Sequence, residues 1–240
     1  SYLEAVRNGT VSAVLLLFAF ILLYFLKSDR SIKKVALISS VIMLLFLYGY
    51  ASSVSPHSTQ GHRWKTFLET LPLALDTQNN KAWLNPKKYP YPKMKNGETV
   101  IDSNYERIAW IKEGVVWTWE NPLGAGFGRN AFAHAMKRKY ADEDVIAAHS
   151  HSGVVDLAIG TGVPGLLLWL LFIGYLMLHA IKKFRSRESY YGLLLFFITA
   201  DFFMRSLVDS ILRDHMLQMF LFIAALLYVL MLSEKEEVVI

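Results

Sequence analysis

The chain has 240 residues, of which 54% are hydrophobic, and its mean hydropathy is +0.32. This apolar content is too high for an ordinary soluble domain of this length. The net charge of +5 lies largely in short links between apolar segments, which argues against a nucleic-acid partner. The sequence contains no cysteine, which excludes disulfides, thiolate metal sites and a cysteine nucleophile.

Five apolar blocks predict about five membrane-spanning helices. They cover residues 10–26, 35–50, 163–181, 192–204 and 216–232. The second and fourth blocks reach spanning length only when their flanks are included. Because the chain starts at Ser1 rather than Met, we expect further helices upstream. The predicted fold is therefore all-α, that of a polytopic helical membrane protein.

The charges between the blocks predict the orientation of the helices. Short links rich in Lys and Arg stay in the cytoplasm, and residues 27–34 and 182–187 are such links. Residues 1–9, 51–162 and 206–215 then lie on the outer side. We therefore expect three regions: residues 1–52 with two spans, residues 53–162 as a long periplasmic loop, and residues 163–240 with three spans and a short cytoplasmic tail.

The long loop is predicted to be mainly helical. Apolar residues recur at helical spacing over residues 62–76, whereas residues 77–102 contain turn signals and are expected to be irregular. A second helix should begin at Ser103, where Ser103 and Glu106 match a capping box, and end before Asn121.

The rest of the loop leads toward the third span. A glycine-rich structural turn follows at residues 124–128, and residues 130–140 predict a short helix. The first half of residues 147–169 predicts a helix on the membrane surface. Gly160, Gly162, Pro164 and Gly165 should break it before the span.

Two histidines, His149 and His151, flank a serine in this last segment. A histidine near a membrane boundary suits acid–base chemistry near neutral pH. The alternative is a surface histidine that caps a short helix. A metal site is disfavoured because no third ligand lies at suitable spacing.

Four arginines are expected on the outer side, namely Arg7, Arg107, Arg205 and Arg213, and together they suggest an anionic ligand. Arg205 has an alternative partner in Asp201, one turn away in the same span. Trp110 and the other loop aromatics suit either stacking on sugars or an interfacial aromatic belt.

The order of motifs resembles the C-terminal half of the O-antigen ligase and O-antigen polymerase superfamily. The matching motifs are R-N-G-T at 7–10, S-x-Y-E-R-x-x-W at 103–110, E-N-P-L-G-x-G-F-G at 120–128, and the segment from His151 to Leu166 with its T-G-V-P-G-L end. The family's histidine motif usually reads His-Asn, and Ser152 replaces that Asn here.

The resemblance implies a GT-C-like glycosyltransferase in the bacterial inner membrane with its active site facing the periplasm. The implied donor is an undecaprenyl-diphosphate-linked glycan, and the implied acceptor is lipid A–core, with no cofactor, metal or nucleic acid. By motif position, His151 corresponds to the proposed base, while Arg7 and Arg107 correspond to arginines that hold the diphosphate. Arg205, Trp110 and His149 are expected to help bind diphosphate or glycan.

Two alternatives to a ligase remain from the sequence. A polymerase or a protein O-oligosaccharyltransferase of the same superfamily would share these motifs. A lipid or ion transporter subunit would account for Asp201 and Arg205 within a span, but it would not need a Trp-rich loop of this length.

Overall fold

The computed structural model describes residues 59–126, 128–187, 189–213 and 215–234, together with four helical positions at 18, 21, 37 and 41. The first two predicted spans lie outside the described residues except for these four positions. The description below therefore concerns the predicted loop and the last three predicted spans.

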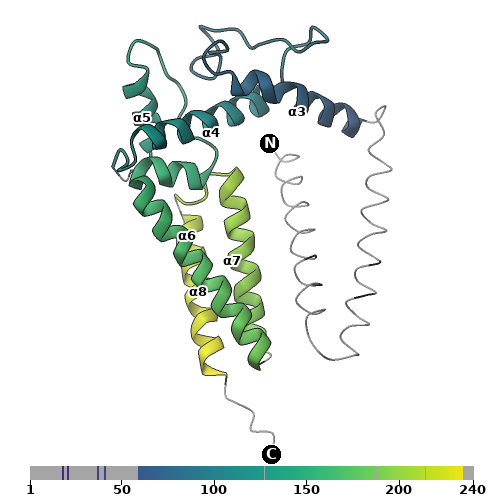
Figure 1. Ribbon diagram of the computed structural model, residues 1–240, viewed down its shortest axis with the longest axis vertical. Coiled ribbons are helices and arrows are strands. Elements are labelled where there is room, and N and C mark those ends of the chain that lie inside the picture. The colour runs from purple at the N-terminus through teal and green to yellow at the C-terminus, as the bar shows by residue number, and fades with distance from the viewer. Residues whose placement is uncertain are drawn as a thin grey trace, which may run out of the picture. The chain divides into compact units, whose positions relative to one another are not determined.

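The described chain is helical (Figure 1). Its helices are α3 (Thr59–Leu75), α4 (Asp102–Glu120), α5 (Ala131–Lys139), α6 (Gly153–Arg187), α7 (Tyr190–Val208) and α8 (His215–Ser233). The extended pairing found in the described ranges is one isolated bridge between Lys93 and Thr99. The all-α prediction is confirmed, as is the irregular stretch between α3 and α4.

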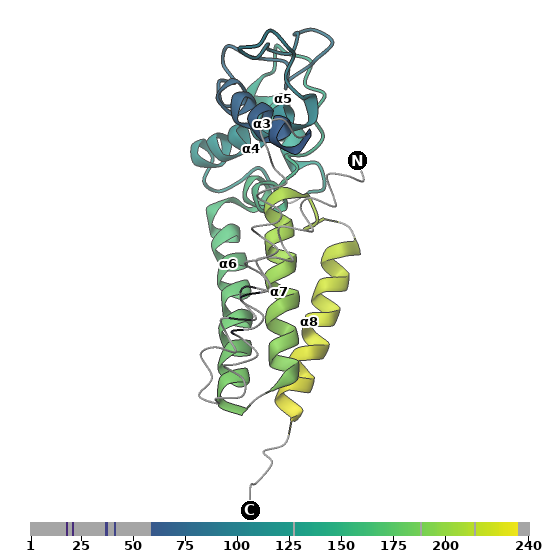
Figure 2. The ribbon, with the colours of Figure 1, turned by 90° about the vertical axis from the view of Figure 1, so that its right-hand side faces the viewer.

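Three of these helices, α6, α7 and α8, are long and apolar enough to cross a membrane. They contain the third, fourth and fifth predicted spans and run side by side in both views (Figures 1 and 2). The chain is thus an all-α polytopic membrane protein.

The described residues fall into two compact units, each of which is treated separately. Among the described residues, the loop unit comprises residues 59–170 and 206–213, so it includes the first turns of α6 and the link between α7 and α8. The span unit comprises the described residues of 171–205 and 215–234.

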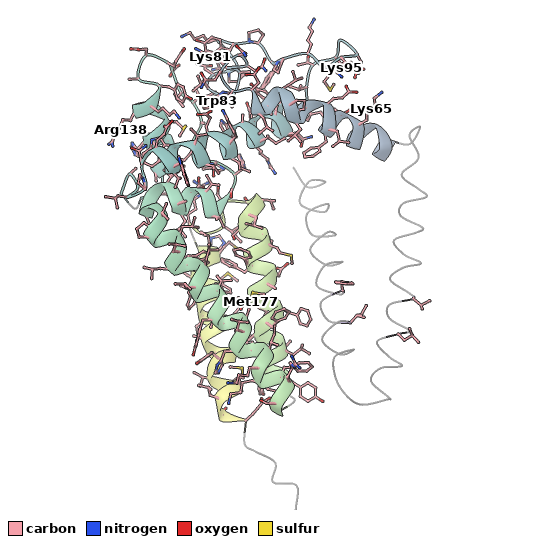
Figure 3. All side chains as sticks on the ribbon, viewed as in Figure 1. Lys65, Lys81, Trp83, Lys95, Arg138 and Met177 are labelled. Atoms are coloured by element: carbon pink, nitrogen blue, oxygen red, sulfur yellow. The ribbon has the colours of Figure 1, made fainter. Side chains whose placement is uncertain are left out.

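The loop unit has a hydrophobic core of its own. Trp83, Tyr105 and Phe132 are almost fully buried in it, whereas Lys81, Lys95 and Arg138 extend from the surface (Figure 3). Helix α6 contributes Val155 and Ile159 to the same core. Burial of these side chains anchors the first turns of α6 to the rest of the loop.

The start of α4 differs from the prediction. Helix α4 begins at Asp102 and its N-cap residue is Ile101, which has no side-chain acceptor, so Ser103 is not at the N-cap position that the expected capping box with Glu106 requires. Glu106 instead accepts a 2.6 Å hydrogen bond from the Tyr91 hydroxyl, and the Ser103 N–H donates to Asp102 Oδ1. The prediction was wrong because a tertiary partner from the irregular stretch holds the glutamate.

The end of α4 agrees with the prediction. The helix ends at Glu120, and the following turn packs backbone to backbone against a break in α6 at Gly162. Gly162 has φ 71° and ψ −174°, which interrupts the helical hydrogen bonds. Amides of the turn replace them: the Ala125 and Gly126 N–H groups donate to the carbonyls of Ile159 and Gly160 at 2.8 and 3.0 Å.

The bonding across this junction is reciprocal. The Val163 N–H, just past the break, donates to the Pro122 carbonyl at 2.8 Å. A Cβ on Gly162 would lie 2.4 Å from that carbonyl oxygen, and a Cβ on Gly124 would lie 2.5 Å from the Gly162 nitrogen. Only glycines allow the two backbones to approach so closely, and both have positive φ.

We expect Gly162→Ala to destabilise the protein, because its Cβ meets backbone that cannot rotate away and its φ is left-handed. The expected loss is about 1–3 kcal/mol, measured as a lower midpoint of thermal unfolding in detergent. Gly128→Ala is the matched control, since a Cβ there meets nothing within 4 Å. Equal midpoints for the two variants would contradict this account of the junction.

Candidate active site

The segment that carries the two histidines is not helical. Residues 147–152 precede α6, so the expectation of a surface helix holds only from Gly153 onward. Asp156 organises this approach, because its Oδ1 accepts the Ser150 N–H at 2.9 Å and its Oδ2 accepts the Ser210 hydroxyl at 2.6 Å. The first turn of α6 therefore folds the preceding segment back onto itself.

Ser152 occupies the position where the family motif usually has Asn. It is 2% exposed, and its Oγ accepts the Val155 N–H at 3.4 Å, as expected of a helix N-cap. Ser and Asn are both favoured N-cap residues. The replacement therefore preserves a local structural role in starting α6 immediately after His151.

His151 has a backbone conformation that non-glycine residues seldom adopt, with φ 58°. The turn brings the imidazole ring of His151 next to that of His149, with 4.2 Å between ring centroids and 48° between the planes. Both side chains are half-buried. Two histidines that would point apart on a helix are thus brought together by one left-handed residue.

Trp110 of α4 packs against His151 of this histidine pair. Its ring stacks on His151 with 5.3 Å between centroids and 12° between planes. The indole N–H of Trp110 donates to the Trp83 carbonyl at 2.9 Å, which fixes the orientation of the ring. Trp83 in turn donates its own indole N–H to the Thr77 carbonyl. A chain of aromatic contacts therefore connects the core of the loop unit with His151.

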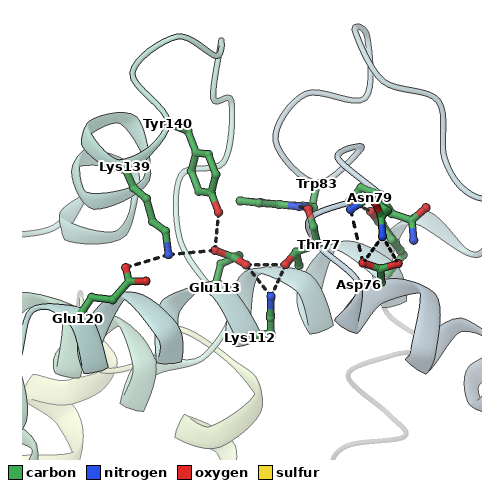
Figure 4. A network of polar contacts seen from close by, with 11 residues as sticks. Asp76, Thr77, Asn79, Trp83, Lys112, Glu113, Glu120, Lys139 and Tyr140 are labelled. Atoms are coloured by element: carbon green, nitrogen blue, oxygen red, sulfur yellow. Dashed lines mark hydrogen bonds and ion pairs between the residues drawn. The ribbon is translucent and has the colours of Figure 1, made fainter.

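A buried carboxylate, Glu113, lies at the centre of a polar network in the same unit (Figure 4). Glu113 is 1% exposed and accepts hydrogen bonds from Thr77 at 2.5 Å, Tyr140 at 2.7 Å and Lys112 at 2.9 Å. Lys139 lies 3.5 Å from its other oxygen. Burial opposes ionisation, but the hydrogen bonds outweigh burial and hold the pKa of Glu113 below its usual value.

A second set of contacts holds the chain just before the histidines. Glu143 accepts hydrogen bonds from Lys88 at 2.6 Å and from Tyr89 at 2.7 Å, and these bonds lower the pKa of Glu143 to about 2. The Ile146 N–H donates to the Leu84 carbonyl at 3.0 Å. The irregular stretch thus fixes both Trp110 and the approach to His149.

Arg107 lies one helical turn before Trp110, so both side chains emerge from the same side of α4. Burial is the main cause that lowers the pKa of His151 to about 4, followed by the charges of His149 and Arg107. Burial also lowers the pKa of His149, followed by the charge of Arg213. Both imidazoles are therefore neutral at pH 7, and the charges of Arg107, Arg213, Asp156 and Asp209 all act on this cluster.

Asp156 and Asp209 of this cluster were not selected from the sequence, whereas Arg213 was noted there as one of four outer arginines that suggest an anionic ligand. Asp156 and Asp209 lie close enough to raise the pKa of both histidines, and Arg213 lowers that of His149. Asp209 and Arg213 belong to the link between α7 and α8, far from the histidines in sequence. The one available signal was the acidic residue in the first turn of α6, at Asp156.

The remaining predicted site residues are Arg7 and Arg205. Arg7 lies outside the described residues. Arg205 is exposed near the end of α7, in the span unit, and its role stays a prediction. In the described part of the chain, no group of three or more His, Cys, Asp or Glu side chains is arranged to hold a metal ion.

We expect His151 to titrate near pH 4 and His149 below the ordinary value of 6.5. The unfolded chain takes up protons at higher pH than the folded one, so the stability contributed by His151 is complete above pH 6.5 and lost as the pH falls to about 4. Exchange of the imidazole C2 hydrogen with deuterium, followed by mass spectrometry, measures each pKa. Titration of His151 near 6.5 would contradict its burial beside Arg107.

The sequence matches the family model described as O-antigen ligase over residues 2–170. No curated protein matches it significantly, and neither does any solved structure. The matched residues include α4, the turn packed against Gly162, and His151 with its helix cap; they end before α7 and α8. The chain therefore belongs to the O-antigen ligase family, membrane proteins of the ligase and polymerase type that act on lipid-linked glycans.

Proposed function

We propose that this protein transfers an O-antigen glycan from undecaprenyl diphosphate to a lipid A–core acceptor, at the periplasmic face of the bacterial inner membrane. The observation that carries the proposal is the placement of a neutral His151 against Trp110, with Arg107 on the same side of α4. Family membership supports a lipid-linked glycan as substrate.

His151 acts as the general base. An acceptor hydroxyl attacks the anomeric carbon of the donor glycan, and the His151 imidazole takes the hydroxyl proton as the new C–O bond forms. The bond between the anomeric carbon and the diphosphate oxygen breaks, and undecaprenyl diphosphate leaves with the electron pair. Attack opposite the leaving group inverts the anomeric carbon, which product NMR tests directly.

Arginines stabilise the leaving diphosphate. Its negative charge grows as the sugar–oxygen bond breaks, so fixed cations lower the barrier without reorganising. Arg107 suits this role because its charge already acts on both histidines. We propose Arg7 and Arg205 as further contributors, and Trp110 and His149 as the groups that contact the glycan or diphosphate.

Binding of the donor is expected to change the pKa of His151. A pKa of about 4 makes free His151 a weak base, but a diphosphate bound near Arg107 adds negative charge that favours the imidazolium. Donor binding should therefore raise the pKa of His151 toward the working pH, where general-base catalysis is more effective. His151 then becomes an effective general base only when the donor is bound.

We expect His151→Asn to lower kcat for glycan transfer by about 100-fold or more, because a positioned general base contributes that order of rate. Asn tolerates the left-handed backbone of this position, so the fold should survive. His134→Ala is the matched control, since His134 is an exposed histidine of the loop unit and lies on α5. The assay uses purified full-length protein with a defined lipid-linked donor and lipid A–core acceptor.

Three results would count against this proposal. Normal transfer by His151→Asn would remove the assignment of the base. Activity only toward a second lipid-linked glycan, or only toward a protein side chain, would favour a polymerase or a protein O-oligosaccharyltransferase. Retained donor binding with no transfer to any acceptor would favour a lipid transporter subunit.

The pH profile gives an independent expectation. The acid limb of kcat/KM for the donor reports the free enzyme, so we expect it near pH 4. The acid limb of kcat reports the donor complex and should lie at higher pH, because the bound diphosphate raises the pKa of His151. Coincident acid limbs would show that the donor does not act on the base.

A further inference from the structure

The link between α7 and α8 is bonded to the histidine segment at several points. The Gly153 N–H, at the start of α6, donates to the Asp209 carbonyl at 2.9 Å. Ser210 donates its hydroxyl to Asp156, whose other oxygen accepts the Ser150 N–H. One carboxylate thus joins the link to the backbone between the two histidines.

The contact is also sterically close. A Cβ on Gly153 would lie 2.9 Å from Leu212 Cγ and 3.2 Å from the Asp209 carbonyl oxygen. Leu212 is 8% exposed, so this part of the link is packed rather than free in solvent. Arg213 follows Leu212 directly, and the packing therefore restricts where its side chain can lie.

Arg213 carries a second positive charge into the histidine cluster. Its charge acts on His149, while that of Arg107 acts on both histidines. The opposing carboxylate of Asp156 is already engaged by two hydrogen bonds. The cluster therefore has one arginine on α4 and another on the link.

His149 has an unsatisfied polar atom at this place. Its Nδ1 is buried, and no hydrogen-bond partner for it is found among the described residues. Leaving a buried nitrogen unpaired is unfavourable, so such an atom in a charged cluster indicates a ligand position. A neutral imidazole beside an arginine suits an anionic oxygen ligand, to which an imidazole N–H and the guanidinium both donate.

We propose that Arg213 and His149 form a diphosphate-binding subsite, so that the α7–α8 link takes part in donor recognition. This inference rests on the proposed function, in which the donor carries a diphosphate. It adds a binding residue beyond position 170, where the match to the family model ends. The link thereby contributes to the site through a cation and not only through packing.

Binding of a short polyprenyl diphosphate to the purified full-length protein tests the subsite without any chemistry. Farnesyl diphosphate should bind more tightly than farnesol, and Arg213→Gln should weaken its binding by about tenfold or more. Arg213→Lys should recover part of the affinity because it keeps the charge but loses the fork. His134→Ala should bind as the wild type does.

The pKa of His149 provides a second readout, which a structural role for Arg213 would not change. Farnesyl diphosphate should raise this pKa in the wild type, and Arg213→Gln should reduce that increase. The charged groups that act on His149 are Arg213, Arg107, Asp156 and Asp209, and the ring of His151 lies next to it. If Arg213→Gln unfolds, the test is the pKa of His149 in the wild type, which should rise with farnesyl diphosphate and not with farnesol.

Unchanged affinity in folded Arg213→Gln, or no response of His149 to the diphosphate, overturns the subsite. Equal binding of farnesol and farnesyl diphosphate overturns it as well. Arg213-dependent binding without glycan transfer would leave the subsite standing while the transferase proposal fails. Normal glycan transfer together with diphosphate binding that does not depend on Arg213 would leave the transferase proposal standing while the subsite fails.

A separate surface of the loop unit is apolar and exposed. Its residues are Val115 and Trp119 of α4 and Leu123 of the following turn, with exposed fractions of 56%, 86% and 82%. Val115 and Trp119 are one turn apart on the same side of the helix. Large exposed apolar groups that gather in this way mark a contact surface.

Hydrogen bonds place this surface beside the start of the third span. Pro122 accepts the Val163 N–H, so Leu123 lies at the level where the apolar part of α6 begins. Leu167 and Leu168 follow on α6, about 6 Å farther along its axis, and are 54% and 69% exposed. The apolar surface therefore lies near the start of the apolar run of α6.

We infer that Val115, Trp119 and Leu123 lie in the headgroup–acyl boundary of the bilayer. Trp favours this boundary because its indole has an apolar body and a polar N–H. The contact would hold the second half of α4 on the membrane surface and keep Trp110 and His151 close to the lipid headgroups.

Spin labelling tests the contact, because residues 1–240 contain no cysteine and a thiol introduced among them is unique within this sequence. A nitroxide at Leu123→Cys, in lipid nanodiscs, should collide more with oxygen than with a water-soluble nickel chelate. Lys95→Cys, in the exposed irregular stretch, should show the reverse. Preference of the Leu123 label for nickel, or protection from both reagents, would overturn the membrane contact.

Discussion

The junction between the α4 turn and the break in α6 is the contact on which the loop unit depends. A helix interrupted near a membrane leaves carbonyls without partners, and those of Ile159 and Gly160 would be exposed in this way. The amides of Ala125 and Gly126 bond to them instead. The loop thus completes the hydrogen bonding of the helix that it adjoins, and α6 can turn at the membrane boundary without losing stability.

This junction sets the geometry of the candidate site, because α4 and the histidine segment lie on either side of it. Gly114 of α4 packs so closely on Val155 that a Cβ would come within 2.4 Å of it. Trp110, one turn earlier on α4, then meets the ring of His151. The buried Glu113 and the bonds from Thr77 and Trp83 add rigidity, which a base and a cation need if they are to act on one substrate.

Helix positions followed well from the sequence, because each depends on local signals. Apolar blocks indicated α6 to α8, and Pro122 indicated the end of α4. Hydrogen-bond partners that are distant in sequence could not be predicted from local signals. Glu106 matched a capping box but accepts a bond from Tyr91, and the bond from Ser210 to Asp156 was not predicted. The left-handed turn at His151 was also missed, since it depends on bonds made by Ser150 and Asp156. His149, His151, Arg107 and Trp110 were selected from the sequence and belong to one cluster, although their roles stay predictions. Asp209 was not selected, because its place follows from tertiary packing.

The conformation of His151 has a consequence for how this position tolerates change. A left-handed backbone excludes β-branched side chains on steric grounds, while Gly, Asn and Asp are accepted. The accessible substitutions therefore conserve the turn but not the imidazole. A variant library at residue 151 would separate shape from chemistry, since Gly and Asn preserve the turn but lack the imidazole that the proposed proton transfer needs. The backbone and the side chain of this residue are thus under different constraints.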